Sequence, residues 1–441
     1  MRHGSRVPAI LLAVAVLTPS GLAFADAEIQ ATIAASTGWT DNYTAGSGTT
    51  SDSVFTSLEP GAQVLSASEN TVQRLSYRMG LNFFLAGGGS TSLSNNLAWD
   101  LSHTISDFTE SLLSASISHI TTDTATPVTT DVGGGINALP AGANQFLGFN
   151  LGAGLSHQIS DLWRTTQGVN GSYTTPVSSD GFLVGKTFTG TAALGLDRDF
   201  ENSNAGINLG GTYTFIEGLG MGAVGAGPLT DQKQVLFTAV ARYTRPFTPE
   251  WTLDVSAGAA GAAPADDVGN LDIFPTGGGV LGWQVEKHSA GISYNHGVVL
   301  NPFLRQNIVA DDVVVRGGIP LADSRWLITG AIGYQHARTL TFDSAENTAT
   351  LNLFSVDVAL AYEISPLANL GARYQFADQS SDAVAGTMTA VVPDLVRNSI
   401  SLVFTAKYPD QTKTVIPFRQ PLKMLRDPTL GEPERPRGRG F

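Results

Sequence analysis

An alternation between apolar and polar side chains, repeated along the chain, limits what this sequence can fold into more than any other feature. The clearest copy runs from Asn398 to Tyr408. Successive side chains of a β-strand point to opposite faces, so this segment has one apolar face and one mainly polar face. The apolar face carries Ile400, Leu402, Phe404, Ala406 and Tyr408. Similar segments recur between turn residues, which predicts many antiparallel strands of the same two-faced kind.

The composition narrows the class of protein. The chain has 441 residues, of which 49 are glycine, none is cysteine and 14% are charged. The absence of cysteine excludes disulfides and thiolate metal sites. No stretch reaches the roughly 18 unbroken apolar residues that a membrane-spanning helix needs. If the mature chain crosses a bilayer, it must do so as a closed barrel, because a barrel pairs all its backbone polar groups internally.

The N-terminus has the pattern of a secretory signal peptide. Arg2 and Arg6 precede an apolar core at 9–17, and Ala23-Phe24-Ala25 offers a small-x-small cleavage site. The segment is too short for a stable membrane anchor. We therefore expect residues 1–25 to be a cleaved signal peptide and residues 26–408 to form a barrel.

Charge divides the mature chain into an acidic body and a basic tail. Residues 409–441 hold seven basic and four acidic residues, together with six prolines, whereas the mature chain as a whole carries a net charge of −15. We expect the tail to be a Pro-rich, extended segment on the periplasmic side. An acidic body does not favour nucleic-acid binding.

The strand pattern predicts an all-β fold, namely a transmembrane antiparallel up-and-down β-barrel of about 18 strands, with 16 to 20 as the range. Short and long connections alternate along the sequence, as expected for periplasmic turns and external loops. Among the short connections we place a turn at Asp197-Arg198-Asp199. Among the long ones we place a loop that contains Gly220 to Gly225 and another that adjoins Asp311-Asp312.

Aromatic residues support a membrane location. Three tryptophans follow short turns and three tyrosines lie at strand ends facing them, where amphipathic rings would meet a membrane interface. The alternative is ordinary aromatic packing at the rim of a soluble barrel. These predicted interface aromatics are Trp163, Trp251, Trp326, Tyr243, Tyr362 and Tyr408.

Charged residues in the polar phase of the strands are candidates for the lumen wall, because a charged group facing lipid is costly. Mixed signs there would create a hydrogen-bonding surface for polar solutes, or would merely form salt bridges that stiffen the wall. The candidates are Arg78, Asp100, Arg242, Asp254, Asp357 and Arg373.

No pattern in the sequence indicates catalysis, a metal or a cofactor. Gly220 to Gly225 matches GxGxxG, but no helix pattern follows it, as a dinucleotide site would require. The six histidines of the mature chain are scattered over different strands, and none forms an HExxH motif. We expect a protein that is not an enzyme. A hydrolase whose Ser, His and Asp converge from separate strands stays an alternative.

Two stretches resemble known outer-membrane proteins. The last strand, which ends in Tyr408, is similar to the closing strand that the barrel-assembly machinery recognises. Gly38 to Asn42, Ser51 to Phe55, Leu58 to Gly61 and Leu75 to Tyr77 resemble the opening strands of outer-membrane β-barrel porin families of Gram-negative bacteria, some of which accompany exopolysaccharide loci. The resemblance implies an outer-membrane barrel and polymer export.

The sequence therefore predicts an outer-membrane channel for hydrophilic solute or polymer, with the pore of an exopolysaccharide export pathway as the specific hypothesis. A general diffusion porin is the alternative, and an outer-membrane hydrolase or a non-conducting structural or adhesion barrel is the second alternative. Expected partners are outer-membrane lipids and lipopolysaccharide, the barrel-assembly machinery, and a periplasmic export partner bound through the tail. No nucleic acid is expected.

Overall fold

The computed structural model describes residues 27–41, 52–85, 90–122, 144–178, 186–217, 231–269, 271–301, 306–321, 325–339, 350–382 and 394–408. The predicted signal peptide, the predicted tail and the GxGxxG segment lie outside these ranges. Among the described residues, no helix is long and apolar enough to cross a membrane.

The fold is all-β and has 18 strands, which confirms the predicted class and strand number. Each strand has 14 to 17 residues. The strands are β1 Ala27–Thr40, β2 Ser53–Ala67, β3 Thr71–Phe84, β4 Ser90–Ser106, β5 Thr109–Thr122, β6 Asn144–Gln158, β7 Trp163–Ser178, β8 Thr187–Phe200, β9 Ser203–Ile216, β10 Gln232–Pro246, β11 Trp251–Pro264, β12 Asp272–Val285, β13 His288–Asn301, β14 Gln306–Pro320, β15 Trp326–Thr339, β16 Thr350–Ser365, β17 Ala368–Asp382 and β18 Leu395–Tyr408.

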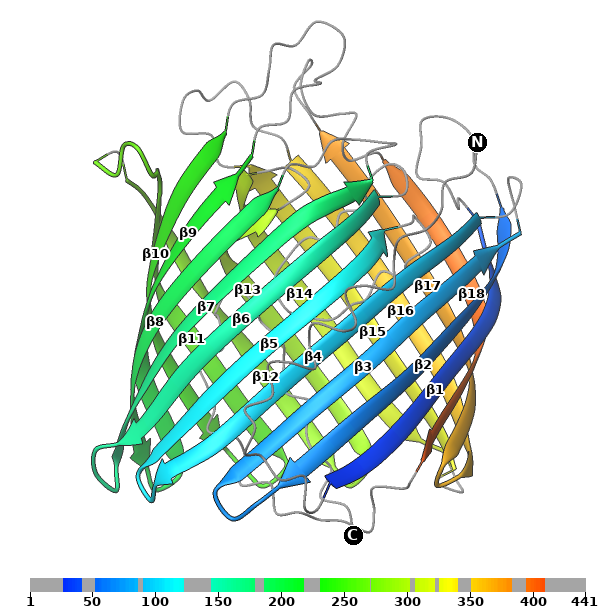
Figure 1. Ribbon diagram of the computed structural model, residues 1–441, viewed down its shortest axis with the longest axis horizontal. Coiled ribbons are helices and arrows are strands. Elements are labelled where there is room, and N and C mark those ends of the chain that lie inside the picture. The colour runs from blue at the N-terminus through cyan, green and yellow to red at the C-terminus, as the bar shows by residue number, and fades with distance from the viewer. Residues whose placement is uncertain are drawn as a thin grey trace, which may run out of the picture.

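Every strand pairs antiparallel with its neighbours in sequence, and β1 pairs with β18, so the sheet closes into a barrel. The strands are steeply tilted around a single cylinder (Figure 1). Short connections such as 107–108, 201–202 and 286–287 lie at one end, which we call the turn end. The opposite end, where the long connections lie, is called the loop end. β1 starts and β18 finishes at the turn end.

Two details of the sequence prediction were wrong. Asp197, Arg198 and Asp199 lie inside β8, and the turn that follows is Glu201-Asn202. The paired acidic residues Asp311 and Asp312 lie inside β14 and do not adjoin a loop. In both cases we interpreted a short run of charged residues as a turn or as the edge of a loop. The residues on either side of each run continue the hydrogen-bonded ladder.

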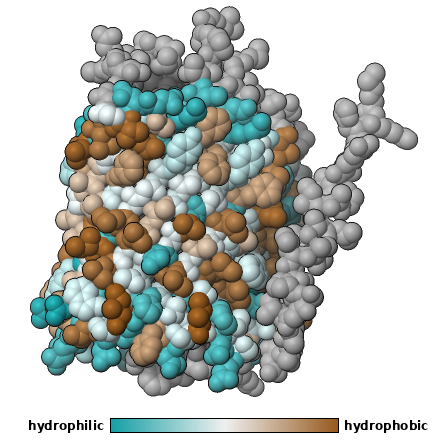
Figure 2. Space-filling model, turned by 60° about the vertical axis from the view of Figure 1, so that its left-hand side comes forward, coloured by the Kyte–Doolittle hydropathy of each residue, from teal (hydrophilic) through white to brown (hydrophobic). Residues whose placement is uncertain are grey.

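The two faces of the sheet are distinguished by their side chains. Directly paired residues of antiparallel strands share a face, so the pairing carries one face continuously around the barrel. The outer face is apolar and exposed: Ile29 is 66% exposed, Leu209 51% and Leu402 59%. The space-filling view shows mainly apolar and weakly polar side chains over the wall, with hydrophilic ones gathered along both ends (Figure 2).

Most of the buried apolar side chains lie on the inner face near the loop end, and we call this group the inner apolar belt. They are less than 9% exposed, although they share a face with polar and charged residues lower in the same strands. The belt comprises Phe84, Phe146, Ile216, Leu236, Ala260, Ala262, Ile308, Ala310, Ala337, Leu351, Leu353, Ala377 and Leu395. The core of this barrel is therefore a ring inside its loop end.

Close strand contact requires glycine at Gly258, on the inner face of β11, because a Cβ there would collide with the backbone carbonyl oxygen of Ala239. We expect Gly258→Val to prevent formation of the folded barrel, measured as loss of the heat-modifiable band on an SDS gel. Gly282→Val is the matched control, since Gly282 also faces inward and has nothing within 4 Å of a Cβ. Equal folding of the two variants would contradict the register of β10 and β11.

Candidate functional site: the lumen wall

The structure places all six predicted lumen residues on the inner face of the sheet. Arg78 pairs with Gly61 and Asn96, opposite in phase to the outward-facing Tyr77. Arg242 and Asp254 have the same phase on β10 and β11, while Asp357 and Arg373 have it on β16 and β17. Asp100 lies on β4, directly opposite Arg74 of β3.

Five of the six residues belong to cross-strand ion pairs. The Nε of Arg242 donates to both carboxylate oxygens of Asp254 at 3.0 and 3.1 Å. Arg373 binds Asp357 in the same way at 3.1 and 3.0 Å, and Gln375 Nε2 adds a third donor at 3.0 Å. Asp100 accepts from Arg74 Nε at 3.1 Å and Nη2 at 2.7 Å. Arg74 was not among the sequence candidates, although its polar phase in β3 indicated it.

The ion pairs differ in exposure to water, and therefore in how much they stabilise the fold. The side chains of Arg74 and Asp100 are 52% and 41% exposed, whereas that of Asp357 is 12% exposed. Exposed pairs contribute roughly 0–1 kcal/mol because water screens them. A carboxylate removed from water depends more on its donors, since leaving a buried charge unpaired is costly. The wall-stiffening role therefore applies most strongly to Asp357.

Two inward arginines have neither a hydrogen bond nor an ion pair with any other residue that the structure describes. Arg78 is exposed in the lumen and lies near the middle of β3. Arg316, which sequence reasoning did not single out, is partly buried on the inner face of β14, opposite Gly291 and Ala331. These uncompensated guanidinium groups make the wall locally attractive to anions.

Most lumenal ion pairs and most buried apolar side chains lie at different levels of the barrel axis, although the buried Arg397 lies near the loop end beside Leu395. The three ion pairs lie in the half nearer the turn end, together with the contact between Arg164 and Asp199 at 3.6 Å. The inner apolar belt occupies the loop end.

The six predicted interface aromatics all project from the outer face at the turn end. Trp163, Trp251 and Trp326 are the first residues of β7, β11 and β15, and the ring of Tyr362 lies 4.6 Å from that of Trp326. Two residues that the prediction missed complete the group. Trp283 lies 6.4 Å from Trp251, and the guanidinium of Arg198 lies 5.3 Å from the ring of Trp163.

A second set of outward aromatics, near the middle of their strands, was also missed. Tyrosines on β3, β13, β15 and β17 donate to an Asn or Asp on the next strand: Tyr77 to Asn95 at 2.8 Å, Tyr294 to Asp311 at 2.8 Å, Tyr334 to Asn352 at 3.2 Å and Tyr374 to Asn398 at 2.8 Å. The sequence signal was a Tyr in the apolar phase of four odd-numbered strands. The outer face therefore carries amphipathic side chains near mid-strand as well as at the turn end.

Histidines do not gather into a site in the part of the chain that the structure describes. His296 Nδ1 lies 2.8 Å from Asp311 Oδ1, and His336 Nδ1 lies 2.8 Å from Asn352 Oδ1, both on the outer face. His103 and His157 contact threonines on neighbouring strands. No group of three or more metal-ligating side chains occurs among the described residues. That the protein is not an enzyme stays a prediction.

No protein-family model matches the sequence, and no curated protein matches it. Solved barrels resemble the fold at low identity. OccAB3 from Acinetobacter baumannii has a TM-score of 0.46 at 9% identity, covering 87% of this chain and 100% of that one. OccK2 (OpdF) from Pseudomonas aeruginosa, solved with glucuronate, has a TM-score of 0.45 at 12% identity, covering 87% and 98%. The siderophore receptor PirA from the same organism has a TM-score of 0.43 at 7% identity, covering 86% and 80%. None of these matches places the chain in a family.

The difference in exposure between the ion pairs predicts a difference in stability. We expect Asp357→Asn to lower the free energy of unfolding by about 2 kcal/mol, because it leaves the Arg373 charge without its carboxylate. Asp100→Asn should lower it by less than about 1 kcal/mol. Urea unfolding in lipid vesicles measures both values. A loss at Asp100 as large as that at Asp357 would contradict the assignment.

Proposed function

We propose that this barrel is an outer-membrane channel for small hydrophilic solutes. The observation that carries the proposal is the closed 18-stranded sheet, with apolar side chains outside and ion pairs inside. A closed barrel is one of two architectures that satisfy every backbone polar group in a bilayer. The signal-peptide pattern at residues 1–25 supports export to that location.

The dimensions of the barrel support a conduit. Eighteen strands spaced by about 4.8 Å and tilted by about 40° enclose a backbone cylinder about 35 Å across. Side chains alone do not fill a cylinder of that width, and larger barrels enclose aqueous channels. Arg78 and the ion pairs give the turn-end half of the wall polar contacts for a solute.

The polysaccharide export hypothesis is the finer version of this function. It rests on the resemblance of the opening strands and on the basic tail, and no contact in the described residues favours a polymer over a small solute. We therefore propose the general channel as the function. Export stays a prediction, which secretion of polysaccharide by a deletion strain would test.

The membrane-spanning role predicts opposite effects for an arginine on the two faces of one strand. Leu209 faces outward near the middle of β9, and Asn208 faces inward beside it. We expect Leu209→Arg to lower stability by about 2–4 kcal/mol in lipid vesicles, because a charge at the bilayer midplane is poorly solvated. Asn208→Arg should fold nearly as well as the natural protein. Equal tolerance of both substitutions would argue against a bilayer around β9.

The channel role predicts ion conductance and a defined contribution from Arg78. Refolded protein in a planar bilayer should conduct potassium chloride. Arg78→Glu should shift the reversal potential towards cation selectivity, because it replaces a lumenal positive charge by a negative one. Arg78→Lys is the matched control and should leave selectivity unchanged. A folded barrel without conductance, both with and without residues 409–441, would contradict the proposal.

A further inference from the structure

The wall of the barrel is not sealed equally all the way round. β11 and β12 stay paired up to Ala262 and Asp272, at the loop end. The pairing of β12 with β13 ends earlier, at Gly277 and His296, although β12 begins at Asp272 and β13 continues to Asn301. The loop-end parts of β12 (272–276) and β13 (297–301) therefore form a seam without ladder hydrogen bonds.

Pro275 explains why the ladder ends at this point. Gln284 donates its backbone N–H to Glu250, on the β11 side, so the odd-numbered positions of β12 direct their N–H groups towards β13. Position 275 has this phase, and continuing the register would place Pro275 opposite Val298. Proline has no N–H to donate and is disfavoured within a sheet. The ladder therefore stops one step before it, at Gly277.

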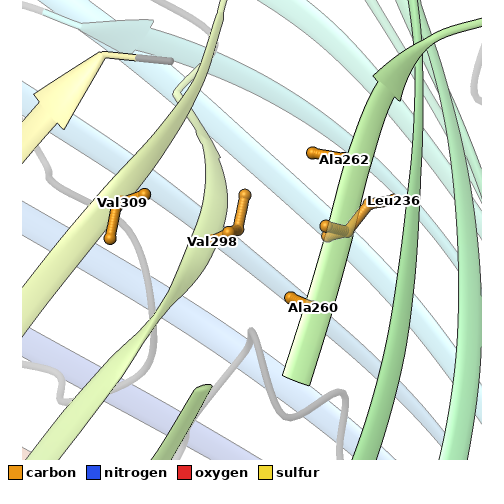
Figure 3. Close-up of a cluster of buried hydrophobic side chains, with 5 residues drawn as sticks. All are labelled: Leu236, Ala260, Ala262, Val298 and Val309. Carbon is orange, nitrogen blue, oxygen red and sulfur yellow. The ribbon is translucent and has the colours of Figure 1, made fainter. Parts of the chain in front are cut away.

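Side-chain contacts show that the wall overlaps itself at the seam. Val298 and Val309 share the outer phase with Ile292 and Val315, which are both 47% exposed, yet Val298 is 1% and Val309 3% exposed. Both valines belong to one packed cluster with Leu236, Ala260 and Ala262. Those three residues lie on the inner face of β10 and β11, across from the valines (Figure 3). The loop ends of β13 and β14 thus lie inside those of β10 and β11.

The seam is held by apolar contacts and by one hydrogen bond, which Thr276 Oγ1 donates to the carbonyl oxygen of His296 at 3.0 Å. Phe274 of β12 packs against the same cluster. The first ladder pair below the seam contains His296, which lies in an outward row with Asp311, His336 and Asn352. Unpaired backbone groups are not tolerated against hydrocarbon, so a break belongs at the headgroup level that such a row marks.

We propose that this seam is a lateral portal for a single-chain amphiphile, which passes between the inner apolar belt and the outer leaflet. The proposal rests on the channel function. An alkyl chain would slide between Val298 and Val309 on one side and Ala260 and Ala262 on the other, while its polar group stays at the headgroup level. Parting these side chains breaks no ladder hydrogen bond, whereas opening the wall between any fully paired strands does.

A reversible disulfide across the seam, which we call the lock, tests the portal. The chain has no cysteine, so Ala260→Cys with Val298→Cys introduces the only thiols. The probe is a dodecyl maltoside derivative with a diazirine on its alkyl chain, added to proteoliposomes and photolysed. In the reduced barrel we expect the probe to label Leu236 and Val240 on the inner wall. Oxidation should lower this labelling at least several-fold, and reductant should restore it.

Pro275→Val tests the same portal without a cross-link, because it restores the missing backbone donor. Pro60→Val is the matched control, since Pro60 interrupts the β2–β3 ladder only locally and pairing resumes at Gly61. We expect Pro275→Val to reduce inner-wall labelling and Pro60→Val to leave it unchanged. Inner-wall labelling that neither the disulfide nor Pro275→Val reduces would overturn the portal. A complete absence of inner-wall labelling would overturn it as well.

Ion conductance distinguishes failure of the portal from failure of the channel. The locked barrel should conduct potassium chloride as well as the reduced one, because the lock closes a side path and leaves the axial lumen alone. Lock-dependent labelling in a barrel that never conducts would support the portal and contradict the channel. Conductance that is lost with the lock would instead place Val298 in the axial path and overturn the lateral route.

Discussion

The pairing of backbone hydrogen bonds around a closed ring of strands is the constraint on which the other features depend. In a ring there is no edge, so each strand must satisfy both neighbours, and one residue of slippage would exchange its two faces. The registers agree around the full circuit: Trp39 shares the outer face with Val54 on one side and with Ile400 on the other. The apolar exterior and the charged interior follow from that agreement.

Much of this architecture could be predicted from the sequence, because a period of two is a local property. The strand number and the inward phase of residues such as Arg242 and Asp254 need only the alternation and the turns between strands. Turn positions were less secure. Asp197 and Asp199 have the composition of a turn, but their side chains face the lumen within β8, and chain reversal occurs after Phe200.

The partners of the lumenal charges could not be predicted, since they depend on register between strands. Nothing in the local pattern says that Asp100 forms its ion pair with Arg74 rather than with Arg78. The inner apolar belt is a different case. Leu353 and Leu395 lie in the polar phase of their strands, and such exceptions to the alternation were visible. Their meaning emerged only when the register of three neighbouring strands, β16 to β18, placed them with Ala377 in one cluster.

The seam shows how one residue changes a closed wall. Pro60 and Pro275 both remove a donor from a strand, yet pairing resumes beyond Pro60 and does not resume beyond Pro275. The difference lies in what happens next along the chain: the valines beyond Pro275 find apolar partners on the inner wall. Hydrophobic burial there substitutes for a backbone ladder, and a contact of that kind is non-directional and parts without leaving polar groups unpaired.

The two-faced closed barrel in a bilayer is the central claim, and a spin-label accessibility scan of β9 tests it most directly. Single cysteines introduced from Asn204 to Thr214 would carry the label, and collisions with oxygen and with a water-soluble nickel chelate would be measured in lipid vesicles. A two-faced barrel in a bilayer should show two accessibilities that alternate out of phase with a period of two, oxygen being highest at Ile207, Leu209 and Gly211. Accessibilities without that alternation would contradict it.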